Sequence, residues 1–427
     1  MNIEKLYTLY TQSYKVSTDT RKITQGCLFF ALKGANFNGN QFAEEALKKG
    51  AAYAIVDEKV YQKSPHIILV EDVLKTLQTL ATYHRKQLTI PIIGLTGSNG
   101  KTTTKELINA VLSTTYKVCA TKGNLNNHIG VPLTLLSMNP ETEMGIVEMG
   151  ANHLEEIAFL CSMALPDYGY ITNFGKAHLE GFGSLEGVVK GKTELYRHLK
   201  SRGKIVFVNA NDAQQVKASK GCKQITFGDG KSNADITIRF VAVNPFVVLT
   251  YNSLRIETHL IGAYNFNNCA AAIAMGSYFK VSDDNMKDAI ENYVPDNNRS
   301  QIIEKGNNKI ILDAYNANPS SMVAALENLF RLTDTSKIAI LGDMFELGKE
   351  AATEHRKIAD FIAEKQFTKA YLIGENFYRT LQNHPNIKVF KTFEDFKNYF
   401  SGLPIENTTL LIKASRGMAL ERVLELL

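Results

Sequence analysis

Residues 96–102 read Thr-Gly-Ser-Asn-Gly-Lys-Thr, and the expected fold can be built outward from this stretch. An apolar run at 90–95 precedes it, and apolar residues return at helical spacing over 105–112. The two glycines let the backbone turn tightly and present N–H groups to a phosphate, at the positive end of the helix dipole. The Lys101 ammonium can reach the terminal phosphates, and the Thr102 hydroxyl can hold Mg²⁺. The stretch therefore predicts a strand, a nucleotide phosphate loop and a helix.

The spacing within this loop leaves a second interpretation open. Only Ser98 and Asn99 separate Gly97 from Gly100, fewer residues than the usual phosphate loop has. The alternative is a glycine-rich turn between strand and helix that binds no ligand. Gly-Lys-Thr at a helix start has little structural use, which favours the phosphate loop.

Composition limits the class of protein. The 427 residues are enough for two to four domains, and 44% hydrophobic with 21% charged residues is typical of a globular protein. A net charge of +5 without a dense basic block suits an anionic small substrate and does not indicate nucleic acid binding. The five scattered cysteines, and the lack of a signal peptide or an apolar stretch of bilayer length, favour the cytoplasm without membrane insertion.

Residues 1–85 predict a small α/β domain. Its expected elements are strands at 27–32, 51–57 and 67–70 and a helix at 42–49. Two polar loops, 17–21 and 33–40, can bind a polar ligand. They can equally supply turn and capping residues, because Ser, Asp and Asn do so routinely. Both interpretations of these loops stay open.

Residues 86–297 predict a central domain with a mostly parallel sheet. Glu148 ends an apolar strand, where a carboxylate beside a phosphate loop is expected to contact magnesium; the alternative is a solvated strand end. His178 follows the next strand, and its place in the same sheet favours a site over a structural role. Alternating apolar residues over 235–260 predict antiparallel strands with one buried face.

Residues 298–427 predict a second doubly wound, Rossmann-like α/β domain, because strand and helix patterns alternate to the end. The expected strands lie at 309–313, 337–341, 370–373, 387–390 and 409–413. Polar loops at 313–319 and 342–344 follow two of these strands. Ligands bind in such domains at the carboxyl ends of the strands.

Several motifs together resemble the Mur ligase superfamily of ATP-dependent amide-forming enzymes. They are the phosphate loop, Val-Glu-Met-Gly at 147–150, Ile-Thr-Asn-Phe-Gly-Lys-Ala-His-Leu-Glu at 171–180, and the C-terminal domain. Residues 17–21, 34–39 and above all 313–322 resemble the members that add D-alanyl-D-alanine to UDP-N-acetylmuramoyl-tripeptide. The resemblance covers nearly the whole chain. Asn38 replaces the Asp usual in the second of these segments, and Asn40 departs from the His that usually closes this loop.

The resemblance implies an activity and a role for each of the three domains. ATP phosphorylates the tripeptide carboxylate, and the amine of the dipeptide attacks the acyl phosphate, which releases phosphate. This reaction belongs to peptidoglycan precursor synthesis. The resemblance assigns UDP-substrate binding to 1–85, ATP binding to 86–297 and ligation to 298–427, in an enzyme expected to be a monomer.

The resemblance also implies site residues. The expected ATP contacts are Thr96, Gly97, Ser98, Asn99, Gly100, Lys101, Thr102, Asn268, Arg299 and Asp313, with Asn265 secondary to Asn268. The expected substrate contacts are Ser17, Asp19, Thr20, Arg21, Asn36, Asn38, Asn316, Asn318, Ser321, Ser415 and Arg416. Asn265 and Asn268 can alternatively cap a helix, and Arg299 can be an ordinary surface cation.

Two magnesium ions are expected from the same resemblance. Thr102 and Glu148 suit one ion. Glu148, His178 and Lys192 suit the second, with Lys192 carrying a CO₂-derived carbamate, since oxygen anions suit magnesium. Lys190 is the second choice for the modified lysine, and a surface lysine on a solvated helix is the alternative. The expected catalytic residues are Lys101, Glu148, His178 and Lys192.

Rival functions come from the same superfamily and from outside it. The ligase that adds the third peptide residue and folylpolyglutamate synthase are the nearest, and the Tyr-Asn-Ala-Asn-Pro loop at 315–319 argues against both. A non-catalytic nucleotide-binding protein would tolerate a degenerate loop. Lys101, Thr102, Glu148 and His178 are all present, which favours an enzyme.

We predict that Lys101→Ala keeps the fold and abolishes ligation. The ammonium offsets charge on the transferring phosphoryl group, and loss of such a group costs about 10²–10³-fold in rate. Steady-state phosphate release, with circular dichroism as the folding control, measures this. Near-normal turnover would show that residues 96–102 are not a phosphate loop.

Overall fold

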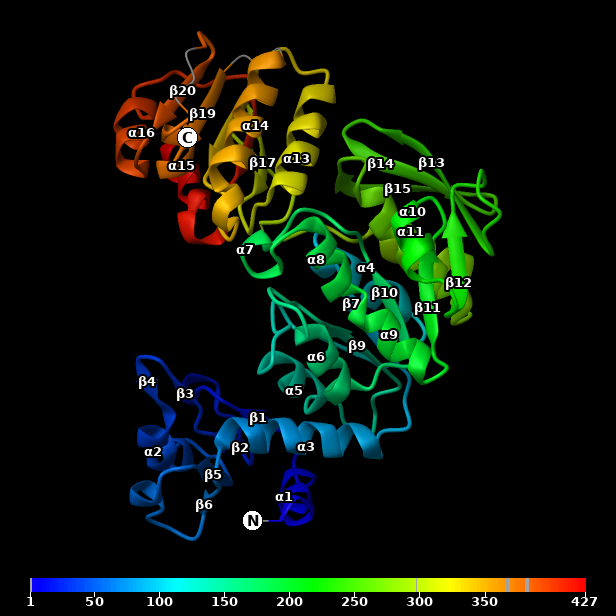
Figure 1. Cartoon of the computed structure of the whole chain (residues 1–427), viewed down its shortest axis with the longest axis vertical. Helices are drawn as coiled ribbons and strands as arrows, with labels where there is room; N and C mark the ends of the chain where they lie inside the picture. Colours follow the sequence, from blue (N-terminus) through cyan, green and yellow to red (C-terminus); the bar gives the residue numbers. More distant parts are fainter. Residues whose placement is uncertain (1, 297, 366, 368, 381–383) are drawn as a thin grey trace.

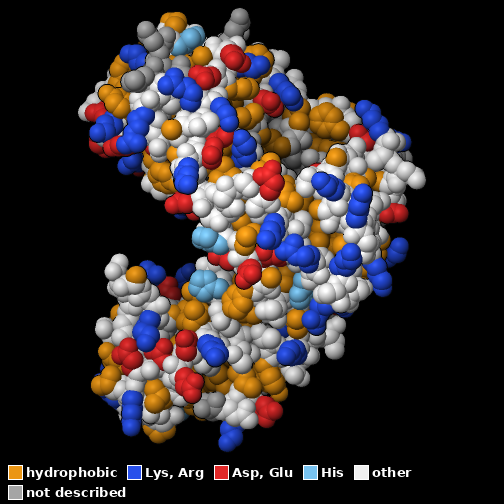
Figure 2. Space-filling view, viewed as in Figure 1, with side chains coloured by type: hydrophobic (Ala, Val, Ile, Leu, Met, Phe, Trp, Pro, Cys, Tyr) orange, Lys and Arg blue, Asp and Glu red, His pale blue; other side chains and the backbone are white. Residues whose placement is uncertain are grey.

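The computed structural model describes residues 2–296, 298–365, 367, 369–380 and 384–427. Three α/β domains follow one another along a curved molecule, with the N-terminal and C-terminal domains at its two ends (Figure 1). Figure 2 shows the side between these two domains deeply hollowed. This architecture confirms the predicted fold class, including the parallel central sheet with its antiparallel extension and the Rossmann-like last domain.

The N-terminal domain is a four-stranded parallel sheet in the order β1-β2-β5-β6. Buried apolar runs form its two middle strands, in keeping with a parallel sheet covered on both faces. Its strands are β1 (Val16–Ser17), β2 (Leu28–Phe30), β5 (Tyr53–Val56) and β6 (Ile67–Leu69), with a small hairpin of β3 (Lys33–Gly34) and β4 (Phe37–Asn38). Its helices are α1 (Ile3–Tyr10), α2 (Ala43–Lys48), α3 (Val73–Gln87) and the 3₁₀ turns η1 (Thr20–Lys22), η2 (Gly39–Phe42) and η3 (Lys59–Tyr61).

Helices α1 and α3 attach this domain to the central one through buried polar contacts. The Tyr10 hydroxyl donates to the carbonyl of Leu136 at 2.9 Å. The Arg85 guanidinium lies 2.8 Å from the Asp167 carboxylate. Helix α3 runs to Gln87, so the boundary expected at residue 85 cuts its last turn. We therefore propose that the first domain extends to residue 87.

The central domain carries a nine-stranded sheet in the order β15-β14-β13-β12-β11-β10-β7-β9-β8. Strands β7 to β13 pair in parallel and β13 to β15 pair antiparallel, as the change of pattern near residue 235 predicts. The strands are β7 (Ile92–Thr96), β8 (Val118–Ala120), β9 (Met144–Glu148), β10 (Tyr168–Ile171), β11 (Ile205–Asn209), β12 (Lys223–Gly228), β13 (Ile236–Val243), β14 (Phe246–Tyr251) and β15 (Leu254–Ile261). The helices are α4 (Lys101–Ser113), α5 (Gly130–Leu135), α6 (Glu156–Ala164), α7 (Leu179–Phe182), α8 (Leu185–Lys192), α9 (Glu194–Ser201), α10 (Ala213–Ala218), α11 (Asn265–Tyr278) and α12 (Asp283–Glu291).

The C-terminal domain is a six-stranded sheet in the order β16-β17-β21-β18-β19-β20. Its first strand was not expected from the sequence; it pairs antiparallel with β17 as a half-buried edge strand, so it lacks a continuous apolar run. The strands are β16 (Gln301–Lys305), β17 (Asn308–Asp313), β18 (Lys337–Gly342), β19 (Lys369–Ile373), β20 (Ile387–Phe390) and β21 (Thr409–Lys413). The helices are α13 (Pro319–Arg331), α14 (Ala351–Glu364), α15 (Glu375–Tyr378), α16 (Phe393–Phe400) and the 3₁₀ segments η4 (Gly348–Glu350), η5 (Arg416–Met418) and η6 (Leu420–Leu426).

The central and C-terminal sheets meet through loops at the carboxyl ends of their strands. The Asn318 amide donates to Asn99 Oδ1 at 2.7 Å, and the Lys176 ammonium lies 2.8 Å from Glu354. The binding edges of two doubly wound sheets therefore face each other. No helix in the described parts of the chain has the length and apolar character needed to cross a bilayer.

We predict that His84 makes the junction of α3 with the central domain sensitive to acid. The ring is buried, with Nε2 2.9 Å from the carbonyl oxygen of Met138 and Nδ1 3.2 Å from the Tyr7 hydroxyl. Burial lowers the pKa of His84 below its ordinary 6.5. The folded protein then binds fewer protons than the unfolded chain, so the free energy of unfolding falls as pH drops below about 6.5.

Urea unfolding at pH 7.5 and 5.5 measures this effect in the wild type and in His84→Asn. The wild type should lose more stability between the two pH values than the variant does. Equal losses would show that His84 does not contribute to the pH dependence.

Candidate active site

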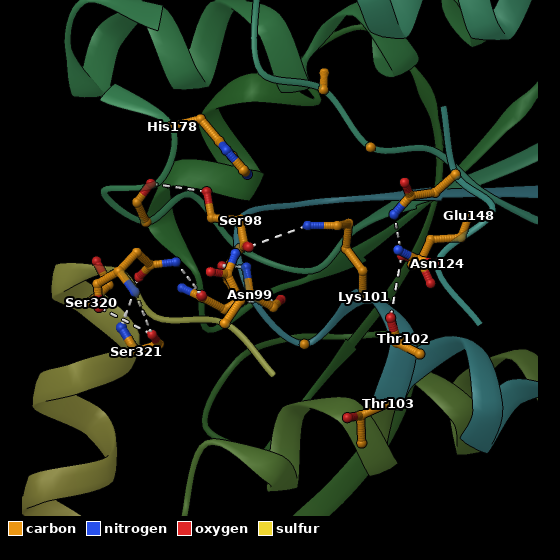
Figure 3. Close-up of a pocket in the computed structure, with 18 of the residues that line it drawn as sticks. Ser98, Asn99, Lys101, Thr102, Thr103, Asn124, Glu148, His178, Ser320 and Ser321 are labelled. Carbon is orange, nitrogen blue, oxygen red and sulfur yellow. Dashed lines mark hydrogen bonds between the residues drawn. The ribbon is translucent and has the colours of Figure 1, made fainter. Parts of the chain in front are cut away.

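One cavity of about 1230 Å³ lies between the central and C-terminal domains. From the central domain it is lined by Ser98 to Thr102, Glu148, His178 and Asn268. From the C-terminal side it is lined by Arg299, Asp313, Asn316, Asn318 and Ser321. Figure 3 shows Thr102 and Glu148 close together in this cavity, with Ser320 and Ser321 at the start of α13 on the other side. Most of the residues that were predicted to contact ATP thus line this one cavity.

The loop 97–100 is shaped by the end of the neighbouring strand β10. Gly97 has φ +146°, and a Cβ there would lie 1.9 Å from the Thr172 hydroxyl, so no side chain fits. That hydroxyl donates to the carbonyl of Asn99 at 2.6 Å, and the Asn99 N–H donates to Asn173 Oδ1 at 3.0 Å. Sequence reasoning gave Thr172 and Asn173 no role, although both stand in the quoted 171–180 motif.

Lys101 turns back on its own loop. Its ammonium donates to the carbonyls of Gly97 at 2.8 Å and Ser98 at 3.3 Å. Burial lowers the pKa of Lys101, Glu148 opposes that shift, and Arg299 adds to it. An anion bound in the cavity can offer this cation stronger partners than two neutral carbonyls. Thr96 does not line the cavity, because it is buried at the end of β7.

Glu148 is buried at the end of β9, with 1% of its surface exposed, so the alternative of a solvated strand end is wrong. Its Oε1 accepts from Asn126 at 2.8 Å and from the Thr102 hydroxyl at 3.3 Å, while Oε2 has no hydrogen-bond partner. A buried, unpartnered carboxylate oxygen beside a hydroxyl fits a magnesium site. The described residues hold no cluster of three or more His, Cys, Asp and Glu that could bind a metal ion.

Lys192 is completely buried, whereas Lys190 is exposed, so the alternative of a surface lysine is wrong for Lys192. Its ammonium donates to the carbonyl of Ala151 at 3.0 Å and lies 5.2 Å from the centre of the Phe182 ring. Burial, with Lys101 adding to it, holds the pKa of Lys192 well below its ordinary value. Lys192 does not line the cavity. The environment therefore favours a neutral amine next to the site.

Asn265 and Asn268 do not cap helix α11, so that alternative is wrong. The helix begins without a side-chain cap, and the Asn265 amide donates to the carbonyl of Ile261 at 2.7 Å. Asn268 donates to Asn265 Oδ1 at 2.7 Å and accepts from the Thr104 hydroxyl at 2.9 Å. Asn268 thus ties α11 to α4, and a Cβ on Gly100 would approach its oxygen to 2.8 Å.

On the C-terminal side, an ion pair and a stacked cation face the cavity. The buried Lys413 ammonium lies 2.6 Å from Asp313 Oδ2, and the Arg299 guanidinium lies 3.6 Å from the centre of the Tyr315 ring. Arg416 approaches the same ring at 5.5 Å. Ser415 does not line the cavity; it is 2% exposed and its hydroxyl joins Phe345 N–H to the carbonyl of Ala317.

Asn318 and Ser321 form the start of α13. Asn318 caps the helix by accepting from Ser321 N–H at 2.9 Å, and the Ser321 hydroxyl accepts from Asn318 N–H at 3.0 Å. This is a capping box. Asn316 Oδ1 accepts from Ala317 N–H, so part of its amide is already used locally.

The predicted substrate residues of the N-terminal domain do not line this cavity. Asp19 caps η1, and Arg21 holds the pKa of Asp19 down at about 2. Asn38 caps η2, and the Ser17 hydroxyl donates to the carbonyl of Asp19. These contacts match the turn-and-cap alternative for the two loops. Thr20 lies in η1, and Asn36 is exposed between β3 and β4.

Comparisons with known proteins cover nearly the whole chain. Family models match residues 13–87 (Mur ligase family, catalytic domain), 95–276 (Mur ligase middle domain) and 298–416 (Mur ligase, glutamate ligase domain). The UDP-N-acetylmuramoyl-tripeptide–D-alanyl-D-alanine ligase of Bacillus subtilis is 34% identical over 97% of this chain and 93% of its own length.

Solved structures agree with the sequence matches. MurF from Acinetobacter baumannii has a TM-score of 0.86 at 28% identity, covering 99% of this chain and 97% of its own. The MurF ligase of Thermotoga maritima, solved in complex with ADP, has a TM-score of 0.83 at 26% identity and covers 96% of both chains.

We predict that Asn318→Ala lowers both stability and nucleotide affinity. Losing the cap costs about 1 kcal/mol, and losing the contact to Asn99 releases the phosphate loop from α13. Thr392→Ala is the matched control, because Thr392 caps α16 in the same domain with a capping box far along the chain from the cavity. Both variants should lose similar stability in urea, and only Asn318→Ala should raise the Kd for ATP. Equal ATP affinity in both would contradict a role for the Asn99–Asn318 contact.

Proposed function

The chain belongs to the Mur ligase family, and on this premise we propose that it joins D-alanyl-D-alanine to UDP-N-acetylmuramoyl-tripeptide at the expense of ATP. The reaction passes through an acyl phosphate and serves peptidoglycan precursor synthesis. The observation that carries the proposal is the shared cavity, in which a phosphate loop faces polar loops of a second α/β domain. The proposed working form is a cytoplasmic monomer that requires neither nucleic acid nor membrane.

The residues present can meet the needs of acyl phosphate formation. Phosphoryl transfer requires positioning and neutralisation of charge more than covalent chemistry. Lys101 can leave its loop carbonyls for the phosphates of ATP, and Arg299 adds a second cation to the same cavity. Asp313 and Asn268 line the same cavity and are proposed to contact the ribose and the base. Closure of the two domains over this cavity would keep water from the acyl phosphate.

Magnesium would be held by the Thr102 hydroxyl and Glu148, and when bound it neutralises charge on the phosphates. A second ion would use Glu148, His178 and a carbamate on Lys192. A neutral amine attacks CO₂ to form the N–C bond and loses one proton, which leaves an anionic carbamate. The lowered pKa of buried Lys192 supplies the neutral amine that this step needs.

The dipeptide is assigned to the C-terminal side of the cavity, and the UDP end of the other substrate is assigned to the N-terminal domain, outside the cavity. Asn316, Asn318 and Ser321 at the start of α13 are proposed to face D-alanyl-D-alanine, with Arg416 near its carboxylate. The loops at Ser17–Arg21 and Asn36–Asn38 are proposed to meet the UDP end across the hollow seen in Figure 2. Their caps and turns fix the backbone of these loops without using every polar group.

The two rival ligases of the superfamily are less well supported. The relative that is 34% identical over 97% of this chain is a D-alanyl-D-alanine ligase by name. The Tyr-Asn-Ala-Asn-Pro loop places Asn316 and Asn318 in the cavity. A non-catalytic protein would have no use for the buried, unpartnered oxygen of Glu148.

The test of the proposed function is phosphate release with ATP, Mg²⁺ and UDP-N-acetylmuramoyl-tripeptide. We predict release with D-alanyl-D-alanine and little with glutamate or a diamino acid as the amine. Preference for glutamate would support a folylpolyglutamate synthase. Release that is independent of any amine and any UDP-substrate would indicate a simple ATPase.

We predict that Lys192→Ala loses ligase activity and that short-chain carboxylic acids restore part of it by replacing the carbamate. Lys190→Ala is the matched control, two residues away and exposed, and should stay active. Carbon-13 NMR with labelled bicarbonate should show a carbamate signal in the wild type and in Lys190→Ala, but not in Lys192→Ala. Full activity of Lys192→Ala would contradict the proposal that Lys192 carries the carbamate.

A further inference from the structure

A carboxylate from the C-terminal domain contacts His178, and neither the motifs nor the comparisons assign it a role. Glu346 lies in the loop that follows β18, and its Oε2 is 2.5 Å from Nδ1 of His178 in the central domain. The Glu180 N–H also donates to the backbone carbonyl of Glu346 at 3.0 Å. His178 lines the cavity, and Figure 3 shows its ring directed inward. His178 was expected to share a magnesium ion with Glu148, and its contact with Glu346 was not expected from the sequence.

The loop that carries Glu346 is fixed at both ends. The N–H groups of Met344 and Phe345 donate to His355 Nε2 at 3.0 Å and to the Ser415 hydroxyl at 2.8 Å. Met344 and Leu347 are buried. This scaffold explains the buried positions of Ser415 and His355, which hold the loop without lining the cavity.

Both partners adopt a backbone conformation that side chains other than Gly rarely take. His178 has φ +53° and Glu346 has φ +62°. Such conformations persist where the surroundings impose them, and they concentrate at functional sites. Here they direct two side chains toward each other from opposite sides of a domain boundary.

The contact determines how His178 faces the cavity. An imidazole nitrogen this close to a carboxylate carries a proton, because two bare lone pairs would repel. A proton on Nδ1 then lies on the side of Glu346, although the ring is not aligned for a regular hydrogen bond, and Nε2 is left for the cavity. A carboxylate behind a functional His commonly fixes its orientation and tautomer in this way.

We propose that Glu346 is a positioning residue that orients His178 for ligation, and that it does so only while the C-terminal domain is docked. The proposal rests on the proposed function, in which His178 serves the reaction centre. The orientation of His178 in the central domain then depends on the position of the C-terminal domain, which is proposed to bind the amine.

The test compares Glu346→Ala with Glu354→Gln. Glu354 is the matched control because its ion pair with Lys176 crosses the same domain boundary without touching His178. Glu346→Ala should lower kcat about 10–100-fold, the usual effect of removing such a partner, with little change in the KM for ATP. Glu354→Gln should change kcat far less. Equal losses in the two variants would show that Glu346 only docks the domains.

Nitrogen-15 NMR of histidine-labelled protein gives a readout that does not depend on ligation. Two-bond proton–nitrogen correlations show which ring nitrogen carries the proton, and His178→Asn identifies the His178 signal. The signal should report Nδ1–H in the wild type and in Glu354→Gln, and should change in Glu346→Ala. An unchanged signal in Glu346→Ala would overturn the proposal. If the wild type lacked D-alanyl-D-alanine-dependent phosphate release, the proposed function would fail, while this spectrum would still decide the His178–Glu346 contact.

Discussion

The cavity depends on the meeting of two sheet edges, and the contact between Asn99 and Asn318 is one of several that join them. Asn99 lies in the loop after β7 and Asn318 caps α13, so one 2.7 Å hydrogen bond joins the central domain to the C-terminal domain. Parallel sheets gather their loops at the carboxyl ends of the strands. When two such edges face each other, a polar cavity forms between rigid scaffolds without any further element.

Lysine side chains lie in this cavity and beside it. Burial lowers the pKa values of Lys101 and Lys192, and the charge of Lys101 lowers the pKa of Lys192 further. Such an arrangement is costly in the free protein, because buried cations lack full solvation. Phosphates, magnesium ions and a carbamate would each relieve part of that cost, which ties binding of ligands to stability of the site.

The fold and half of the site could be predicted from local patterns. Residues 96–102 contain the glycines and the lysine of the motif, so a phosphate loop could be predicted without knowing which residues surround it in the fold. Glu148 and His178 were predicted from their places after strands. Contacts between residues far apart in the chain were harder to predict. The contact of Glu346 with His178 depends on how two domains dock. The burial of Ser415 depends on a loop 70 residues earlier in the chain. The edge strand β16 was missed because its half-buried residues form no apolar run.

The central claim is that one cavity, built by two domains, holds the nucleotide during ligation. A crystal structure with an ATP analogue, Mg²⁺ and UDP-N-acetylmuramoyl-tripeptide tests it most directly. The account predicts the phosphates on residues 97–102, with Arg299 and Asp313 contacting the same nucleotide and Glu148 contacting the metal. A nucleotide held by the central domain alone, with Arg299 and Asp313 turned away from it, would contradict the account.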